Sequence, residues 1–363
     1  MATNNQYSPL TVSHPGTTLA EKLTEMGMSQ REFAIRTNKP EQTIIKVISG
    51  ESAITSDMAV QFENELKIPA HFWLNRQQNY DVAVARNKRQ EVLEAAESWT
   101  NRFPYSQMAK AGWVKQTRMP KEKAEQLFAF FGIASHKAWE DMYCKQELKV
   151  SFRISLAHTK EAHAVSAWLR CGEIQAQTIE VPIYNAKNFK ANLSIIKSLM
   201  AEHPTDFFQR LQAFCLEAGV KVVYTPNLPN APVHGSTRWL NETPFIQLSA
   251  RYKQNDRFWF TFFHEAGHIL LHGKKYISLE NIEYDDSDVN KEREADAFAE
   301  EWTFSKQQEQ EMLKVNPITE GVILEFAEKY NTHPAMIVGR FHHTKRFHYS
   351  EGRQFIMPII IGE

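Results

Sequence analysis

The sequence predicts a mainly α-helical, multidomain protein: an N-terminal bundle of short helices, a helical connector, and a C-terminal α+β domain with a small sheet. Three observations support this fold class. Residues 17–81 carry repeated helix-start and helix-stop signals, an apolar helix is expected at about 258–271, and short β-type segments precede it. A length of 363 residues accommodates two or three domains.

The composition favours an intracellular protein with a net charge close to zero. A net charge of −1 with 42% apolar residues argues against a general attraction to nucleic acid or to anionic lipid. Three widely spaced cysteines, Cys144, Cys171 and Cys215, fit a reducing cytosol without a disulfide framework. The chain shows no secretory signal and no segment of transmembrane character, so we expect a cytoplasmic protein with no membrane partner. The apolar tail at 355–361 is expected to form a terminal strand.

After a flexible tail at 1–16, residues 17–81 are expected to form a module of short helices. Ser29 and Glu32 have the spacing of a capping box, in which each side chain serves a free backbone N–H at the helix start. A second helix is expected at about 41–49, after Pro40 and before Gly50. The side chains expected to pack inward from these two helices are Phe33, Ala34, Ile35, Ile44, Ile45 and Ile48.

Two short helices joined by a tight turn predict a helix-turn-helix, whose second helix presents Gln42, Thr43 and Lys46 outward. Such side chains can bind base edges or phosphates. The stretches 29–34, 50–55 and 72–81 resemble the lambda-repressor-like fold, especially HigA-type antitoxins, and the resemblance implies an operator DNA as partner, bound by a homodimer. The candidate DNA contacts are Gln30, Arg31, Lys39, Gln42, Thr43 and Lys46.

The charge of this module supports an alternative. Between Gly16 and Asp81 there are nine acidic and seven basic residues, a net charge of −2, which is unusual for a module that neutralises phosphates. A helical bundle used for dimerisation or for contact with a toxin is the competing interpretation. Residues 82–204 contain helical periodicity and buried-type tryptophans but no motif with chemistry, so they are expected to form a helical connector.

The strongest chemical motif is His264-Glu265-Ala266-Gly267-His268. On a helix, the two histidines lie one turn apart on the same face, where both can bind one metal ion, and the matching ion is Zn²⁺. Glu265 points to a slightly different side, where a general base for a water molecule belongs. Two core histidines held by hydrogen bonds are the non-catalytic alternative.

A third ligand is expected from the amphipathic helix around 291–302. Glu292 is the expected ligand, with Glu294 as the alternative. Asp296 lies one turn after Glu292 and can hold the outer N–H of a ligand histidine. His272 is one turn too far along the first helix to share the ion, so it is expected to support a ligand or to cap the helix near Gly273.

His264–His272 followed by 292–299 resembles the ImmA/IrrE family of zinc metallopeptidases, whose ligand plan is similar to that of the thermolysin-like gluzincins. The resemblance covers about 205–345, including strands expected at 218–224 and 244–249, so 205–363 is expected to be the peptidase domain. It implies cleavage of a partner protein, often a DNA-bound repressor. His234, Arg238 and Tyr252 are further candidates for polarising the scissile carbonyl.

Together these features predict a DNA-binding regulator with zinc-dependent endopeptidase activity. Its substrate is expected to be a partner regulatory protein in stress response, toxin–antitoxin or mobile-element control. The alternative is a non-enzymatic HigA-like antitoxin or repressor with a structural or latent zinc site. A third interpretation keeps the peptidase but assigns the N-terminal module to protein binding alone. The sequence identifies neither the substrate or toxin nor the operator or the activating signal.

Overall fold

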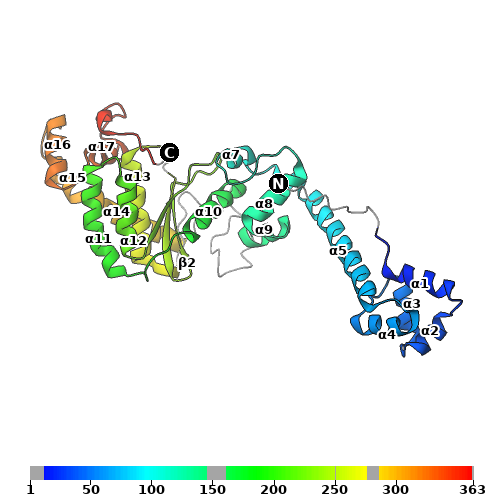
Figure 1. Cartoon of the computed structure of the whole chain (residues 1–363). Coiled ribbons are helices and arrows are strands. Elements are labelled where there is room, and N and C mark those ends of the chain that lie inside the picture. Colours follow the sequence, from blue (N-terminus) through cyan, green and yellow to red (C-terminus); the bar gives the residue numbers. More distant parts are fainter. Residues whose placement is uncertain (1–11, 145–160, 250, 276–285, 362–363) are drawn as a thin grey trace. The chain divides into compact units, whose positions relative to one another are not determined.

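The computed structural model of the chain describes residues 12–144, 161–249, 251–275 and 286–361. The chain divides between Ala95 and Ala96 into two compact units (Figure 1). In the part of the chain that is described, no helix is long and apolar enough to cross a membrane.

Residues 12–95 of the N-terminal unit form five helices joined by short turns. They are α1 (Pro15–Glu25), α2 (Gln30–Arg36), α3 (Glu41–Ile48), α4 (Ser56–Leu66) and α5 (Ala70–Ala95). Phe33, Ile44, Phe62 and Trp73 lie at the centre of their shared core. Because α5 is continuous from Ala70 to Ala95, the boundary expected at residue 81 falls inside this helix.

Several expectations for α2 and α3 are wrong in detail. Ile35 is 72% exposed and Ile45 is 37% exposed, whereas both were expected to pack inward. Only the first half of the capping box forms: Ser29 Oγ accepts the Glu32 N–H at 3.1 Å. The Glu32 carboxylate instead accepts from Arg36 Nη2 at 2.7 Å, because an arginine one turn away offers a charged partner.

In its described residues, the second unit contains the helices from α6 onward and one three-stranded sheet. Its first helices are α6 (Glu97–Thr100), α7 (Tyr105–Lys110), α8 (Pro120–Phe131), α9 (His136–Tyr143), α10 (Ala162–Gln177), α11 (Ala186–Glu202) and α12 (Phe207–Glu217). The later ones are α13 (Asn255–Gly267), α14 (Asp286–Thr303), α15 (Lys306–Met312), α16 (Glu320–Lys329) and α17 (Pro334–His343). Short turns of π- or 3₁₀-helix are η1 (His268–His272), η2 (Gly273–Lys275) and η3 (Arg353–Phe355).

The sheet has the strands β1 (Lys221–Tyr224), β2 (Gly235–Leu240) and β3 (Thr243–Leu248) in the order β1-β3-β2. β1 runs parallel to β3, with Val222 opposite Ile246, and β2 runs antiparallel to β3, with Thr237 also opposite Ile246. β2 is therefore an edge strand of the described sheet. The two strands expected from the sequence around 218–224 and 244–249 correspond to β1 and β3.

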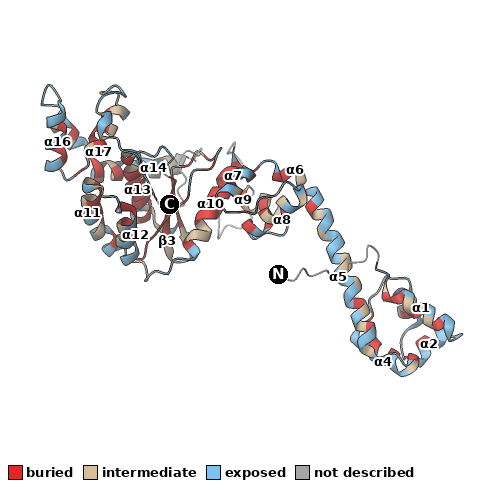
Figure 2. Cartoon of the chain, turned by 45° about the horizontal axis from the view of Figure 1, so that its top comes forward, coloured by how far each residue is buried: buried red, intermediate tan, exposed pale blue. Residues whose placement is uncertain are grey.

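Part of the expected connector belongs to the core of the second unit. Side chains of α11, such as Phe189 and Leu193, pack in one cluster with α12, the strands and α13. The boundary expected at 204 therefore falls between two helices of a single core. Figure 2 shows that residues along α10 and α13 are buried as well.

Buried polar contacts fix α10 against the sheet. Arg238 Nη2 of β2 donates to Leu169 O at 2.7 Å, and Trp168 Nε1 donates to Thr225 O at 3.1 Å. A Cβ atom at Gly172 would lie 2.0 Å from the Gln247 side chain, so only glycine permits this approach of α10 to β3. Residues 162–177 are thus a structural layer of the second unit rather than a spacer.

The C-terminal tail does not form the expected strand. It contains η3 and a single antiparallel bridge between Gln254 and Pro358. Proline has no backbone N–H and cannot continue a ladder at this point. The thiols of Cys171 and Cys215 are buried and free, and Cys144 is half-buried.

Candidate metal centre and nucleic-acid interface

The helix that carries the histidine motif is buried on most of its surface. α13 packs between the sheet and α14, and His264 and His268 are 4% and 1% exposed. The helix does not continue regularly to Leu271 as the sequence suggests. From His268 it widens into the π-helical turn η1, which ends where Gly273 adopts a φ of +61°.

Three candidate ligands converge from α13, η1 and α14. His264 Nε2 lies 2.9 Å from His268 Nε2. Glu292 Oε2 lies 3.2 Å from His264 Nε2, and Glu292 Oε1 lies 3.5 Å from His268 Nε2. One ligand atom from each residue fits within 4.8 Å of the other two. The structure thus brings together two side chains separated by four residues and a third from another helix.

The donor set fits Zn²⁺, which favours imidazole nitrogen and carboxylate oxygen. The outer nitrogens of both rings are also held. Asp296 Oδ1 lies 2.9 Å from His264 Nδ1, and His272 Nδ1 lies 2.9 Å from His268 Nδ1. Such contacts orient the rings so that the inner nitrogens face each other and Glu292.

The electrostatics of the two rings differ. Burial opposes protonation of His264, but the hydrogen bonds to Asp296 and Glu292 outweigh it and raise the pKa of His264 well above its usual value. Burial lowers the pKa of His268 to about 4 despite its contact with Glu292. The same burial thus has opposite outcomes at the two rings, because only His264 has carboxylate partners strong enough to offset it.

Glu294 occupies a different position from Glu292. Its Oε2 lies 2.9 Å from His272 Nε2, and the carboxylate is 63% exposed. The structure therefore places Glu292, and not Glu294, against the imidazole pair. His272 lies between Glu294 and His268, beside the group of three.

Glu265 is fully buried and faces the edge strand β2. Thr237 Oγ1 donates to Glu265 Oε2 at 2.7 Å. A Cβ atom at Gly235 would come within 2.7 Å of Glu265 Oε1, so a larger residue would displace the carboxylate. Sequence reasoning did not find Thr237 or Gly235, because no spacing rule connects a strand residue to a helix residue 28 positions later.

The three candidates for polarising a carbonyl lie in different surroundings. Arg238 is buried and donates to Leu169 O and to Gln247 Oε1, both at 2.7 Å, so it supports the fold. Tyr252 is exposed, and its ring lies 3.9 Å from the Arg257 guanidinium. His234 packs edge-on against Tyr252 and lines a cavity.

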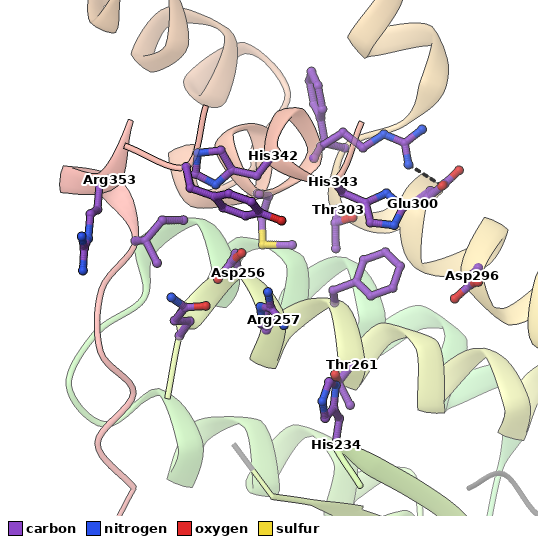
Figure 3. Close-up of a pocket in the computed structure, with 18 residues that line it drawn as sticks. His234, Asp256, Arg257, Thr261, Asp296, Glu300, Thr303, His342, His343 and Arg353 are labelled. Atoms are coloured by element: carbon purple, nitrogen blue, oxygen red, sulfur yellow. Dashed lines mark hydrogen bonds and ion pairs between the residues drawn. The ribbon is translucent and has the colours of Figure 1, made fainter. Parts of the chain in front are cut away.

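That cavity has a volume of about 570 Å³ and lies between α13, α14, α17 and the chain that follows α17 (Figure 3). His234, Thr261 and Asp296 line it, and Thr261 is one turn before Glu265 on α13. Farther along the wall are Asp256, Met336 and the Glu300–Arg340 ion pair. The candidate metal centre thus borders a space large enough for several side chains.

The candidate DNA contacts lie on α2, α3 and the turn between them. Gln42 and Lys46 are exposed on α3 and Thr43 is half-buried, while Gln30 and Arg31 are exposed at the start of α2. Lys39 differs, because its ammonium pairs with Asp57 and its side chain is 18% exposed. Arg36 is similarly paired, with Glu65 at 2.6 Å and Glu32 at 2.7 Å.

Two segments of the chain are similar to known protein families. Residues 215–342 match the peptidase M78 family, described as an IrrE N-terminal-like domain, and residues 19–73 match a helix-turn-helix family. The uncharacterized HTH-type transcriptional regulator YddM of Escherichia coli (strain K12) is 31% identical over 71 residues, which are 20% of this chain and 76% of YddM.

Two solved structures are similar to the N-terminal part. An addiction module antidote protein of the HigA family from Coxiella burnetii shares 30% identity with a TM-score of 0.23, over 24% of this chain and 95% of that chain. Pseudomonas aeruginosa antitoxin HigA, solved with the higBA promoter, shares 27% identity with a TM-score of 0.22, over 22% of this chain and 89% of that chain.

Proposed function

This chain belongs to the helix-turn-helix transcriptional regulators and carries an IrrE-like peptidase domain, and from that premise we propose that it is a zinc-dependent endopeptidase that cleaves a partner regulatory protein. The observation that carries the proposal is the convergence of His264, His268 and Glu292 on one point. We assign these three residues as the zinc ligands. Asp296 and His272 hold the outer nitrogens of the two imidazoles.

A zinc ion held by His264, His268 and Glu292 would act as a Lewis acid on a carbonyl oxygen and would lower the pKa of a water molecule. Glu265 is the general base that takes a proton from the attacking water and returns it to the leaving amine. Thr237 holds one carboxylate oxygen of Glu265 in place through the 2.7 Å hydrogen bond. The cavity lined by Thr261 and Asp296 receives substrate side chains next to the scissile bond.

DNA binding belongs to the N-terminal unit. We propose that Gln42, Thr43 and Lys46 on the exposed side of α3 contact base edges, and that Gln30 and Arg31 contact the backbone. Lys39 contacts phosphate only after release from Asp57. The N-terminal unit binds its operator DNA as a homodimer. The peptidase domain acts on a protein that regulates a stress response, a toxin or a mobile element.

The test is Glu265→Gln in the full chain, with Glu301→Gln on the exposed side of α14 as the matched control. Substrates are sought as proteins that disappear in cells producing the wild-type chain. Glu265→Gln should keep one zinc ion per chain while proteolysis falls by at least about 10³-fold, because proton transfer is lost. Unchanged cleavage would reject the assignment of Glu265. A stoichiometric protein partner that is never cleaved would favour the antitoxin interpretation instead.

A further inference from the structure

A chain of hydrogen-bonding groups extends outward from His268. Its Nδ1 lies 2.9 Å from His272 Nδ1, and His272 Nε2 lies 2.9 Å from Glu294 Oε2. His272 is four residues after His268, within the π-helical turn η1. The wider turn allows the two rings to meet through their Nδ1 atoms, at a centroid distance of 5.1 Å. His264 needs no such chain, because Asp296 contacts its Nδ1 directly.

The chemistry of these groups determines where each proton lies. An ionised carboxylate only accepts hydrogen bonds, so His272 must carry its hydrogen on Nε2. A neutral imidazole has one N–H, and His272 Nδ1 is therefore an acceptor. The proton in the contact between the rings then belongs to His268 Nδ1. His268 Nε2 is consequently left with a lone pair, and this is the atom that faces His264 and Glu292.

The opposite arrangement would leave His268 unable to bind a metal. If His272 donated through Nδ1, His268 would accept there and carry its hydrogen on Nε2, which points at the ligand group. A group at the far end of the chain that can only accept excludes this arrangement. The carboxylate of Glu294 is such a group, and α14 brings it to the site together with Glu292 two residues before it.

We propose that Glu294 is a positioning residue that acts through His272 to keep the Nε2 lone pair of His268 available to zinc. The inference rests on the proposed function, since it assumes that His268 is a ligand. Partners of liganding histidines typically change metal affinity by about 10- to 100-fold. Glu294 is 63% exposed and acts through one intervening ring, so its removal should weaken zinc binding by about tenfold.

The experiment measures zinc affinity of the full chain by competition with a chromogenic chelator. Glu294→Ala should bind zinc about tenfold more weakly than the wild type. Glu294→Gln should recover the affinity only in part, because its amide oxygen can accept from His272 Nε2 but its NH2 group can also donate to that nitrogen. Glu301→Ala is the matched control on α14, and it should bind zinc like the wild type. Truncation of an exposed side chain leaves the core packing intact, which circular dichroism verifies.

Nitrogen-15 spectra of the histidine rings in the metal-free chain provide a second readout. In the wild type, the hydrogens should lie on His272 Nε2 and His268 Nδ1, and Glu294→Ala should redistribute both. Wild-type affinity of Glu294→Ala, or unchanged ring protonation, would overturn the role of Glu294. Failure of the wild-type chain itself to bind zinc would instead reject the proposed function, so the two failures are distinguishable.

Discussion

The two units of this protein use carboxylates in different ways. In the N-terminal unit, Asp57 pairs with Lys39, and Glu32 and Glu65 pair with Arg36, at partly exposed positions. In the second unit, Glu292, Asp296 and Glu294 contact histidines around an almost fully buried pair. Exposed ion pairs contribute little to stability, so the main consequence of the first arrangement is that carboxylates neutralise the positive charges of Lys39 and Arg36. The second arrangement fixes the orientation of the two imidazoles, whose inner nitrogens face Glu292.

The largest expected effect comes from removing a carboxylate of the second unit. Glu292→Ala should reduce zinc affinity by at least about 100-fold, because one of three ligands is lost. The DNA affinity of this variant should be unchanged, since the N-terminal unit is a separate compact unit. Zinc content after dialysis and an electrophoretic mobility shift measure the two quantities. A variant that retains zinc would show that Glu292 is not a ligand.

A change of the edge strand tests whether Glu265 depends on its surroundings. Gly235→Ala places a Cβ 2.7 Å from Glu265 Oε1 and 2.6 Å from Thr261 Cγ2. Cleavage should fall by about 100-fold through misplacement of the base, while zinc stays bound. Gly112→Ala is the control for steric contact, because a Cβ there would meet nothing within 4 Å. The φ of Gly112 is +76°, so this variant carries backbone strain that Gly235→Ala does not. Full activity of Gly235→Ala would contradict the close approach.

Acidification should weaken the second unit more than the first. Burial, with a smaller contribution from Arg102, lowers the pKa of His163 to about 4, and burial lowers that of His333 to about 4. Between pH 6.5 and 4 the unfolded chain therefore binds more protons at these positions, so stability falls as pH falls. In the described residues of the N-terminal unit, His14 is the one histidine whose pKa is lowered by burial.

Calorimetric scans at pH 7 and 5 measure this effect. The raised pKa of His264 increases stability as the pH falls, which opposes the effect of His163. We therefore compare the wild type with His163→Gln, which removes one group. Its melting temperature should depend less on pH than that of the wild type. An identical pH dependence in the two proteins would show that His163 does not contribute.

The smallest expected effect comes from freeing a cation in the N-terminal unit. Asp57→Asn removes the charge partner of Lys39. DNA affinity should rise about two- to eightfold at 0.1 M salt, and the salt slope should steepen by about 1, as expected for one added phosphate contact. Glu21→Gln on α1, away from the pair, adjusts the net charge without releasing Lys39. An equal gain in both variants would mean that net charge alone controls binding.

Much of the N-terminal unit could be predicted because its information is local. Caps such as Ser29 and Thr55, with the spacing of Phe33, Ile44 and Phe62, define short helices from neighbouring residues. Ile35 and Ile45 were placed wrongly because an apolar residue next to a core position need not face the core. The extent of α5 was missed because its polar surface provides no stop signal.

By itself the sequence determined the helical class, the two matched domains, and the pair of histidines four residues apart, because each depends on residues within a few turns of one another. Only the tertiary structure decided that Glu292 and not Glu294 approaches that pair. It alone also showed the hydrogen bond from Thr237 to Glu265 and the ion pair between Asp57 and Lys39. It also decided that α10 and α11 belong to the core of the second unit. These outcomes depend on which surfaces of distant elements face each other. Those surfaces are determined by the packing of the whole core and not by the spacing of neighbouring residues.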